Sequence, residues 1–215
     1  MPRVFNLNPH IPDDRLIKEA VNQLSSGSII VYPTETFYGL GAVYDDETGL
    51  ERIFTVKNRD ISKPVHLLIP DTAALCRITD RVSEISLSVA RKFWPGPVTL
   101  LFPPSANLSP LLIGKSGQIG CRISSHPIAQ RFLNVLNKPV TSTSANISGG
   151  ISPTTIDQIP ESLLSSVDII IDAGETPGGN PSTIIDVTVP PFTVIREGSI
   201  PSEDIFDHIR KYSQT

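Results

Sequence analysis

Short runs of β-branched and aliphatic residues alternate with amphipathic stretches along most of this sequence of 215 residues. The runs have the length and composition of buried strands, and they cover residues 28–32, 65–69, 98–102, 119–123, 167–171, 183–187 and 192–195. The amphipathic stretches repeat their apolar residues at helical spacing over residues 13–24, 48–56, 82–93, 127–136 and 202–212. This alternation predicts an α/β fold, in which helices pack on an open twisted sheet.

The last two strand runs indicate that the sheet is mixed. They are separated by a short segment that contains Pro190 and Pro191, which is typical of a tight connection between antiparallel neighbours. The earlier runs are mostly separated by helical stretches, which suits parallel strands. We therefore predict a mixed sheet flanked by helices, whereas the order of the strands does not follow from these patterns.

A single domain is the simplest organisation for a chain of this size. Because 39% of its 215 residues are apolar, the chain can bury one sizeable core, and its 20 prolines and 14 glycines are spread over turns. We predict one domain over residues 1–215. The net charge of −4 does not favour a sequence-independent grip on nucleic acid, and no apolar window is long enough to cross a bilayer. We expect a cytoplasmic protein without a membrane partner.

Several common kinds of site are not predicted. Cys76 and Cys121 lie far apart in the sequence, so neither a zinc site nor a disulfide framework is indicated. The Gly-Lys-Ser segment at residues 114–116 resembles the end of a phosphate-binding loop, but Ser109 stands where that motif requires its first glycine. A bound nucleotide would therefore have to be held by side-chain cations, hydroxyls and loop amides.

Cations follow the helix predicted at residues 48–56. Lys57 and Arg59 come at its end, and Lys63 follows before the next strand. Cations at the C-terminus of a helix commonly stay solvated and interact with the helix dipole. However, loops at strand ends are where α/β sheets bind ligands, so three cations in one connection indicate an anion site.

A second polar cluster is the hydroxyl-rich segment 141–148, which contains Ser144 and Asn146. Such residues can simply satisfy backbone groups in a turn. Their density exceeds what one turn requires, and small side chains let a ligand approach the backbone closely. We therefore favour the hypothesis that this segment forms the floor of a polar site.

Two arginines and a histidine occupy strand positions. Arg122 lies within an otherwise apolar run and Arg196 follows another, so each guanidinium has to be paired or to face a cleft. For both residues, an ion pair with an internal carboxylate is an equally good explanation. His66 lies on the strand that follows the cationic loop and is the histidine best placed to reach such a cleft.

These residues belong to a series of motifs that runs from about residue 16 to residue 200. The motifs are Pro33-Thr34-Glu35-Thr36-Phe37-Tyr38-Gly39-Leu40-Gly41, Lys57-x-Arg59, Phe93-Trp94-Pro95-Gly96-Pro97-Val98-Thr99, Arg122, Ser144-x-Asn146 with Ser148-Gly149, Pro181-Ser182-Thr183-Ile184-Ile185-Asp186 and Ile195-Arg196-Glu197-Gly198. Together and in this order they resemble the YrdC-like family of threonylcarbamoyl-AMP synthases. The resemblance implies a YrdC-like domain with its core at about residues 16–200 and a basic concave groove in an open twisted sheet.

This resemblance also implies a reaction. L-threonine, bicarbonate or carbon dioxide, and ATP would give threonylcarbamoyl-AMP and pyrophosphate. A separate transferase would then pass the threonylcarbamoyl group to an adenosine beside the tRNA anticodon, and a weak contact of this chain with tRNA fits that role. Mg²⁺ is expected to arrive with ATP and to bridge its phosphates, and no dedicated metal site is predicted.

The resemblance assigns roles residue by residue. Threonine-binding positions are matched by Thr36, Arg122, Ser142 and Ser182. ATP-binding positions are matched by Arg59, Lys63, Gln118, Ser144, Ser152 and Arg196. Lys57 and Asn146 complete the family's signature, so that the predicted catalytic residues are Lys57, Arg59, Ser144 and Asn146. The free carboxylate of threonine suits a bidentate guanidinium such as that of Arg122.

The sequence departs from the family pattern in two motifs and in its length. Asp60 replaces the proline that often follows the Lys-x-Arg motif, and Leu68 stands where some members carry a threonine-binding histidine. Because side chains two positions apart on a strand share a face, His66 is a candidate substitute for threonine binding. The chain ends soon after the last motif, so we expect a short form without an additional C-terminal domain.

Two other functions compete with synthesis of the adenylate. A non-catalytic or differently specific RNA-binding paralogue would share the fold, although the intact Lys57-x-Arg59 and Ser144-x-Asn146 motifs and the acidic total charge count against it. A carbamoyl-transfer protein of the hydrogenase-maturation type would need zinc-finger cysteines and an acylphosphatase region. Two cysteines and 215 residues exclude that type as a complete protein.

Overall fold

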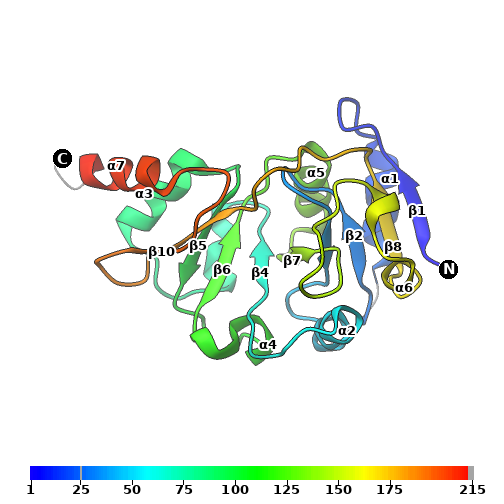
Figure 1. Ribbon diagram of the computed structural model, residues 1–215, viewed down its shortest axis with the longest axis horizontal. Coiled ribbons are helices and arrows are strands. Elements are labelled where there is room, and N and C mark those ends of the chain that lie inside the picture. The colour runs from blue at the N-terminus through cyan, green and yellow to red at the C-terminus, as the bar shows by residue number, and fades with distance from the viewer. Residues whose placement is uncertain (25, 213–215) are drawn as a thin grey trace.

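The computed structural model of the protein describes residues 1–24 and 26–212. Its strands form a ten-stranded sheet in the order β1-β8-β2-β3-β7-β4-β6-β5-β9-β10 (Figure 1). The strands are β1 (Arg3–Asn6), β2 (Ile30–Tyr32), β3 (Gly39–Gly41), β4 (His66–Leu68), β5 (Val98–Phe102), β6 (Ile119–Arg122), β7 (Val140–Ser144), β8 (Ile169–Asp172), β9 (Thr183–Asp186) and β10 (Thr193–Arg196). The sheet is open, as predicted, with β1 and β10 at its edges.

The sheet is also mixed, which confirms the predicted fold class. The β1/β8, β2/β8, β4/β6 and β5/β9 pairs are parallel. The β2/β3, β3/β7, β4/β7, β5/β6 and β9/β10 pairs are antiparallel. β9 and β10 are the two strands joined through Pro190 and Pro191, so the pairing expected for them is correct.

Helices cover both faces of the sheet. They are α1 (Asp14–Gln23), α2 (Glu47–Lys57), α3 (Glu84–Phe93), α4 (Pro110–Ile113), α5 (Pro127–Leu136), α6 (Glu161–Leu164) and α7 (Ser202–Tyr212). Side chains of β2 alternate between two cores: Val31 packs with residues of α2 and α3, whereas Ile30 and Tyr32 pack with residues of α1 and α5. A strand buried on both faces needs an unbroken apolar run, which is why the sequence shows one at this position.

The predicted helices begin and end near residues with capping side chains. Asp13 accepts hydrogen bonds from the backbone amides of the first turn of α1, and Ser83 does the same for α3. His126 precedes Pro127, the first residue of α5. Asn58 is the C-cap residue of α2 and adopts the left-handed conformation with a φ of 49°. Asn58 therefore turns the chain sharply just after Lys57.

Three of the ten strands, β1, β3 and β7, are not among the seven runs that the sequence predicted as strands. β1 is a short edge strand that pairs only with β8 and exposes most of its side chains, so it lacks a strong apolar pattern. β3 has the sequence Gly-Leu-Gly, which has a low strand propensity. Gly41 is required by the close packing, because a Cβ there would lie 2.5 Å from the carbonyl oxygen of Thr141 on the neighbouring strand.

Long connections bring distant segments over the central strands. Residues 145–168 lead from β7 to β8, and residues 173–182 lead from β8, near one edge, to β9, near the other. Backbone hydrogen bonds tie both connections to the segment before β3, from Tyr38 to Pro153 (2.9 Å) and from Gly178 to Thr36 (2.8 Å). Both connections therefore lie beside the segment that leads into β3.

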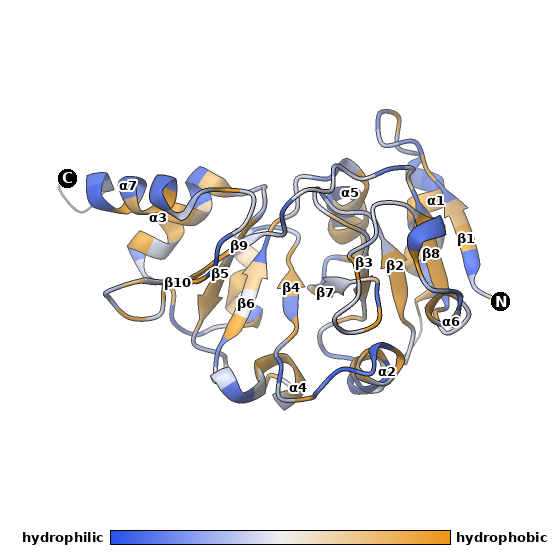
Figure 2. Ribbon diagram, viewed as in Figure 1, coloured by the Kyte–Doolittle hydropathy of each residue, from blue (hydrophilic) through white to orange (hydrophobic). Residues whose placement is uncertain are grey.

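Hydropathy follows this arrangement. Figure 2 shows apolar residues concentrated on the strands and hydrophilic residues on outer surfaces such as that of α7. Ile205 is buried and anchors α7, which packs against α3. Within residues 1–24 and 26–212, no helix combines the length and the apolar character that crossing a bilayer requires.

Candidate active site

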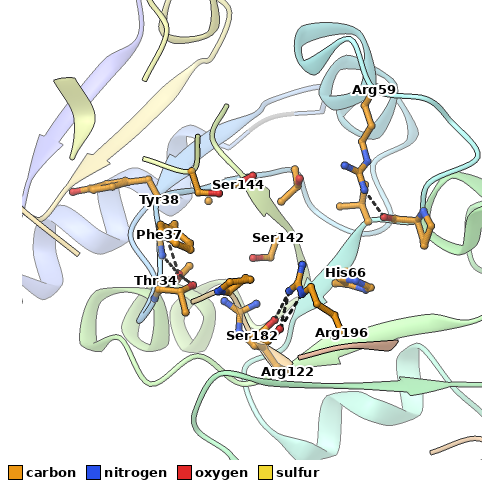
Figure 3. Close-up of a pocket in the computed structure, with 17 residues that line it drawn as sticks. Thr34, Phe37, Tyr38, Arg59, His66, Arg122, Ser142, Ser144, Ser182 and Arg196 are labelled. Atoms are coloured by element: carbon orange, nitrogen blue, oxygen red, sulfur yellow. Dashed lines mark hydrogen bonds between the residues drawn. The ribbon is translucent and has the colours of Figure 1, made fainter. Parts of the chain in front are cut away.

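A polar cavity opens at the middle of the sheet, where the ends of four central strands meet the long connections (Figure 3). It is lined by Thr34, Thr36, Phe37, Tyr38, Gly39, Arg59, Pro64, Val65, His66, Arg122, Ser142, Thr143, Ser144, Ser152, Pro181, Ser182 and Arg196. Hydroxyl and guanidinium groups from segments far apart in the sequence thus face the same space. Such a lining is suited to a ligand with several anionic oxygens.

The cavity brings together most of the residues proposed from the sequence. Those that line it are Thr36, Arg59, His66, Arg122, Ser142, Ser144, Ser152, Ser182 and Arg196. The remaining four, Lys57, Lys63, Gln118 and Asn146, lie outside the lining. Of the three cations that follow α2, Arg59 lines the cavity, whereas Lys57 and Lys63 lie outside its lining.

Lys57 is buried and forms hydrogen bonds with residues 144–146, the segment that forms the floor of the cavity. Its Nζ donates hydrogen bonds to the carbonyl oxygens of Ser144 and Asn146 and to Oδ1 of Asn146 (3.0 Å). The Ser144 hydroxyl donates to the same Oδ1 (2.7 Å), and the amide of Asn146 donates to the carbonyl of Gly150. Lys57 is only 1% exposed, so its ammonium group is held inside the protein by these hydrogen bonds. Lys57 and Asn146 therefore fix the turn that presents Ser144 to the cavity.

Burial and the positive charge of Arg59 lower the pKa of Lys57 to about 7. The three acceptor oxygens work in the opposite direction, because only the ammonium form has three N–H donors. The bonding pattern is therefore that of a protonated lysine. No carboxylate pairs with this ammonium among the described residues, so backbone and amide oxygens supply its whole environment.

Lys63 and Gln118 lie outside the cavity lining. Lys63 is exposed. The side-chain amide of Gln118 donates hydrogen bonds to Asp186 (2.6 Å) and to Thr188 (3.3 Å) at the far end of β9. Contact of either residue with a ligand in the cavity would require its side chain to rearrange.

Arg122 has both a carboxylate partner and a face on the cavity. Its Nε donates to Oε1 of Glu35 at 2.8 Å, and the two side chains are only 7% and 9% exposed. The sequence left two explanations open for Arg122, an internal ion pair or a cleft, and the structure combines them. Glu35 was not identified from the sequence as a site residue, although a carboxylate between Thr34 and Thr36 is the natural partner for a buried arginine.

Arg196 crosses from the edge of the sheet to the cavity. Its guanidinium donates to the carbonyl oxygen of Ser182 (2.8 Å and 3.1 Å) and to the Ser182 hydroxyl (3.0 Å), as the dashed lines in Figure 3 show. The Ser182 hydroxyl also lies 2.9 Å from that of Thr99. The alternative of an ion pair with a neighbouring acid is therefore not observed for Arg196 in the described part of the chain.

His66 faces the cavity as a neutral imidazole. Burial, followed by the positive charges of Arg196, Arg122 and Arg59, lowers its pKa to about 3. Its Nδ1 is buried without a partner among the described residues and lies over Gly120, where a Cβ would come within 2.1 Å of it. Glycine at position 120 is thus what makes room for the His66 ring, and a neutral ring adds no further positive charge to the cavity.

The Glu35–Arg122 pair is expected to contribute to stability in a pH-dependent way. Burial alone would raise the pKa of Glu35, but Arg122 and the Ser124 hydroxyl lower it below the ordinary value of a glutamate. Because the folded pKa is below the unfolded one, the contribution is complete above about pH 4.3 and is lost as pH falls through the folded pKa. We expect the unfolding free energy of the wild type to fall more steeply between about pH 5 and about pH 3 than that of a Glu35→Gln/Arg122→Met variant. Urea titrations at a series of pH values measure both. Equal slopes would contradict this expectation.

The described residues contain no group of three or more His, Cys, Asp or Glu side chains that could hold a metal ion.

Comparisons with known proteins find similar sequences and structures over most of this chain. A family model described as telomere recombination, for the Sua5, YciO and YrdC proteins, matches residues 22–198. A threonylcarbamoyl-AMP synthase of Pyrococcus abyssi is 34% identical over 205 residues, which are 95% of this chain and 60% of that protein. A threonylcarbamoyl-AMP synthase of Photobacterium profundum is 35% identical over 85% of this chain and 98% of its own length.

Solved structures are similar over the same region. The crystal structure of P. abyssi Sua5 complexed with L-threonine superposes with a TM-score of 0.91 at 33% identity, covering 96% of this chain and 61% of that one. The crystal structure of Escherichia coli YciO gives a TM-score of 0.85 at 31% identity, covering 96% of this chain and all of that one. The chain thus spans about three fifths of the P. abyssi protein. By the family model and by these relatives, this chain belongs to the Sua5/YciO/YrdC family.

Proposed function

We propose that this protein is a nucleotidyltransferase that makes threonylcarbamoyl-AMP from L-threonine, bicarbonate or carbon dioxide, and ATP, and releases pyrophosphate. The observation that carries the proposal is the convergence of Arg59, Arg122 and Arg196 with a set of hydroxyls on one cavity. The relatives named threonylcarbamoyl-AMP synthase support the same reaction. The product would serve tRNA modification in the cytoplasm, through a separate transferase and with at most weak contact between this chain and tRNA.

Threonine would bind on the side of the cavity formed by Arg122. A guanidinium can hold a carboxylate through two parallel hydrogen bonds, and Thr36, Ser142 and Ser182 supply hydroxyls for the rest of the amino acid. His66, being neutral, can accept or donate one hydrogen bond there without repelling the amino group as a cation would. The L-threonine complex of the P. abyssi relative supports a threonine site in this fold.

ATP would occupy the side of the cavity near Arg59, Arg196, Ser144 and Ser152. In the proposed reaction a carbamate oxygen forms a bond to the α-phosphorus while the bond from that phosphorus to pyrophosphate breaks. The protein contributes mainly position and charge, because the developing negative charge is spread over phosphate oxygens. Mg²⁺ would enter with ATP on its phosphates.

Lys57 and Asn146 would act by holding Ser144 in place. Both are buried under the cavity floor, and their hydrogen bonds run to that floor and to each other. Lys63 and Gln118 would contact ATP only after their side chains rearrange. The proposal therefore assigns the direct contacts with ATP to Arg59, Arg196, Ser144 and Ser152.

Pyrophosphate release tests the proposal. The wild type is expected to release pyrophosphate from ATP only when both L-threonine and bicarbonate are present, because the adenylated group has to be assembled from both. Release without threonine would indicate a different adenylation. Binding of RNA without any turnover of ATP would instead support the non-catalytic RNA-binding paralogue.

A further inference from the structure

Glu35 occupies a position behind Arg122 that the reaction itself does not use. Its Oε1 accepts the hydrogen bond from Nε of Arg122 at 2.8 Å, and its Oε2 accepts one from the hydroxyl of Ser124. The Ser124 oxygen in turn accepts from the backbone amide of His126 (3.2 Å), the residue that caps α5. Both oxygens of Glu35 are therefore engaged, and the carboxylate is tied to the start of a helix.

The outer edge of Arg122 remains available. A guanidinium has five N–H donors in a fixed fork, and Glu35 uses the one on Nε. Within the part of the chain that the structure describes, the two terminal nitrogens have no protein partner, and they are not enclosed, because Arg122 lines the cavity. In Figure 3 Arg122 lies beside Ser182 and Arg196 at the base of the cavity. A ligand carboxylate could accept both terminal N–H groups at once.

Glu35 also balances charge at this place. Arg122 and Arg196 lie close enough for Arg122 to contribute, after burial, to a lowered pKa of Arg196. Two guanidinium groups in one half-buried site repel each other, and Glu35 offsets one of them from the side opposite the ligand. Tyr32 and His126 are the other titratable groups near this carboxylate, and burial keeps both of them from adding charge.

We propose that Glu35, anchored by Ser124, is a positioning residue that fixes the guanidinium of Arg122 with its terminal nitrogens toward the cavity and thereby makes the amino acid site selective for a free carboxylate. This inference rests on the proposed function, since it concerns the threonine site of that reaction. Glu35 touches no substrate, and its effect passes through the orientation of Arg122. Loss of Glu35 would leave the charge of Arg122 in place but would free its side chain to rotate.

Calorimetric binding of L-threonine and of L-threoninamide, which lacks the carboxylate, tests this role. The wild type is expected to prefer threonine, and Glu35→Ala is expected to bind threonine about tenfold more weakly, the loss typical of a removed hydrogen bond to a charged group. Binding of threoninamide is expected to change little. Ser124→Ala, which removes one hydrogen bond and no charge, is expected to shift the preference in the same direction by a smaller factor.

Asp168→Ala is the control for loss of an arginine–carboxylate pair away from the cavity. Asp168 pairs with Arg52 at 2.8 Å and lies outside the cavity lining, so its loss removes an arginine–carboxylate pair without touching Arg122. This variant is expected to melt at a lower temperature than the wild type and to keep the full preference for threonine. A Glu35→Ala protein that resembles it in both respects would overturn the inference.

Two further outcomes are decisive. Tighter threonine binding by Glu35→Ala would mean that the carboxylate acts only by repelling the ligand, and it would also overturn the inference. A wild type that binds neither threonine nor threoninamide would overturn the proposed function itself. The two failures are thus distinguishable in the same experiment.

Discussion

Replacement of Lys57 by methionine is expected to lower the unfolding free energy by about 3 kcal/mol and kcat/KM for ATP by at least about a hundredfold. Methionine keeps much of the volume of the lysine stem but cannot donate hydrogen bonds. The carbonyl oxygens of Ser144 and Asn146 and the side chain of Asn146 would then lose their shared donor inside the protein. Because that turn presents Ser144 to the cavity, the losses of stability and of activity have one cause.

Urea unfolding and steady-state kinetics on the same samples measure both effects. Lys92→Met is the matched control, because Lys92 lies in the last turn of α3 as Lys57 does in the last turn of α2, but it is exposed. The control is expected to change the unfolding free energy by less than about 0.5 kcal/mol and to keep full activity. If Lys57→Met were as stable as this control, the role given to Lys57 beneath the cavity floor would be wrong.

Replacement of Arg122 by methionine is expected to raise the KM for L-threonine by at least about a hundredfold, since hydrogen-bonded charge pairs in enclosed sites are worth about 2–5 kcal/mol. The KM for ATP is expected to change much less, because Arg59 and Arg196 remain. The same substitution leaves Glu35 buried without its partner, which is expected to cost about 3–5 kcal/mol of stability. The variant would thus show a selective kinetic defect together with a folding defect.

A second variant separates these two defects. Glu35→Gln/Arg122→Met removes both charges of the pair, so most of the lost unfolding free energy is expected to return. Threonine binding is not expected to return with it, because no guanidinium faces the cavity from this strand. Recovery of threonine binding in the double variant would show that Arg122 does not hold the amino acid.

The sequence predicted the fold where its apolar pattern was strong. Strands such as β2 are buried on both faces and read as unbroken apolar runs, and the helices carry regular apolar stripes. β3 could not be predicted in this way, because its glycines are selected by the approach of the neighbouring strand, which is a tertiary constraint. Strand order likewise depends on the long connections over the sheet, whose paths leave no local pattern.

Some residues of the candidate site could be predicted from the sequence, and others could not. Residue type and motif order pointed to Arg122, Ser144 and Arg196, and these do line one cavity. They could not distinguish a side chain that faces a ligand from one that supports it, and for this reason Lys57 was predicted as a catalytic residue together with Arg59 and Ser144. Glu35 was missed because its role appears only when its distance to Arg122 is known. The roles of all these residues in binding and catalysis remain predictions until variants are measured.

Mass spectrometry of the product formed from ¹³C-bicarbonate tests whether this protein assembles threonylcarbamoyl-AMP. We expect an adenylate that carries threonine and one ¹³C atom, formed only when ATP, L-threonine and bicarbonate are all present. An unlabelled threonyl-adenylate, or AMP without any adenylate intermediate, would contradict it.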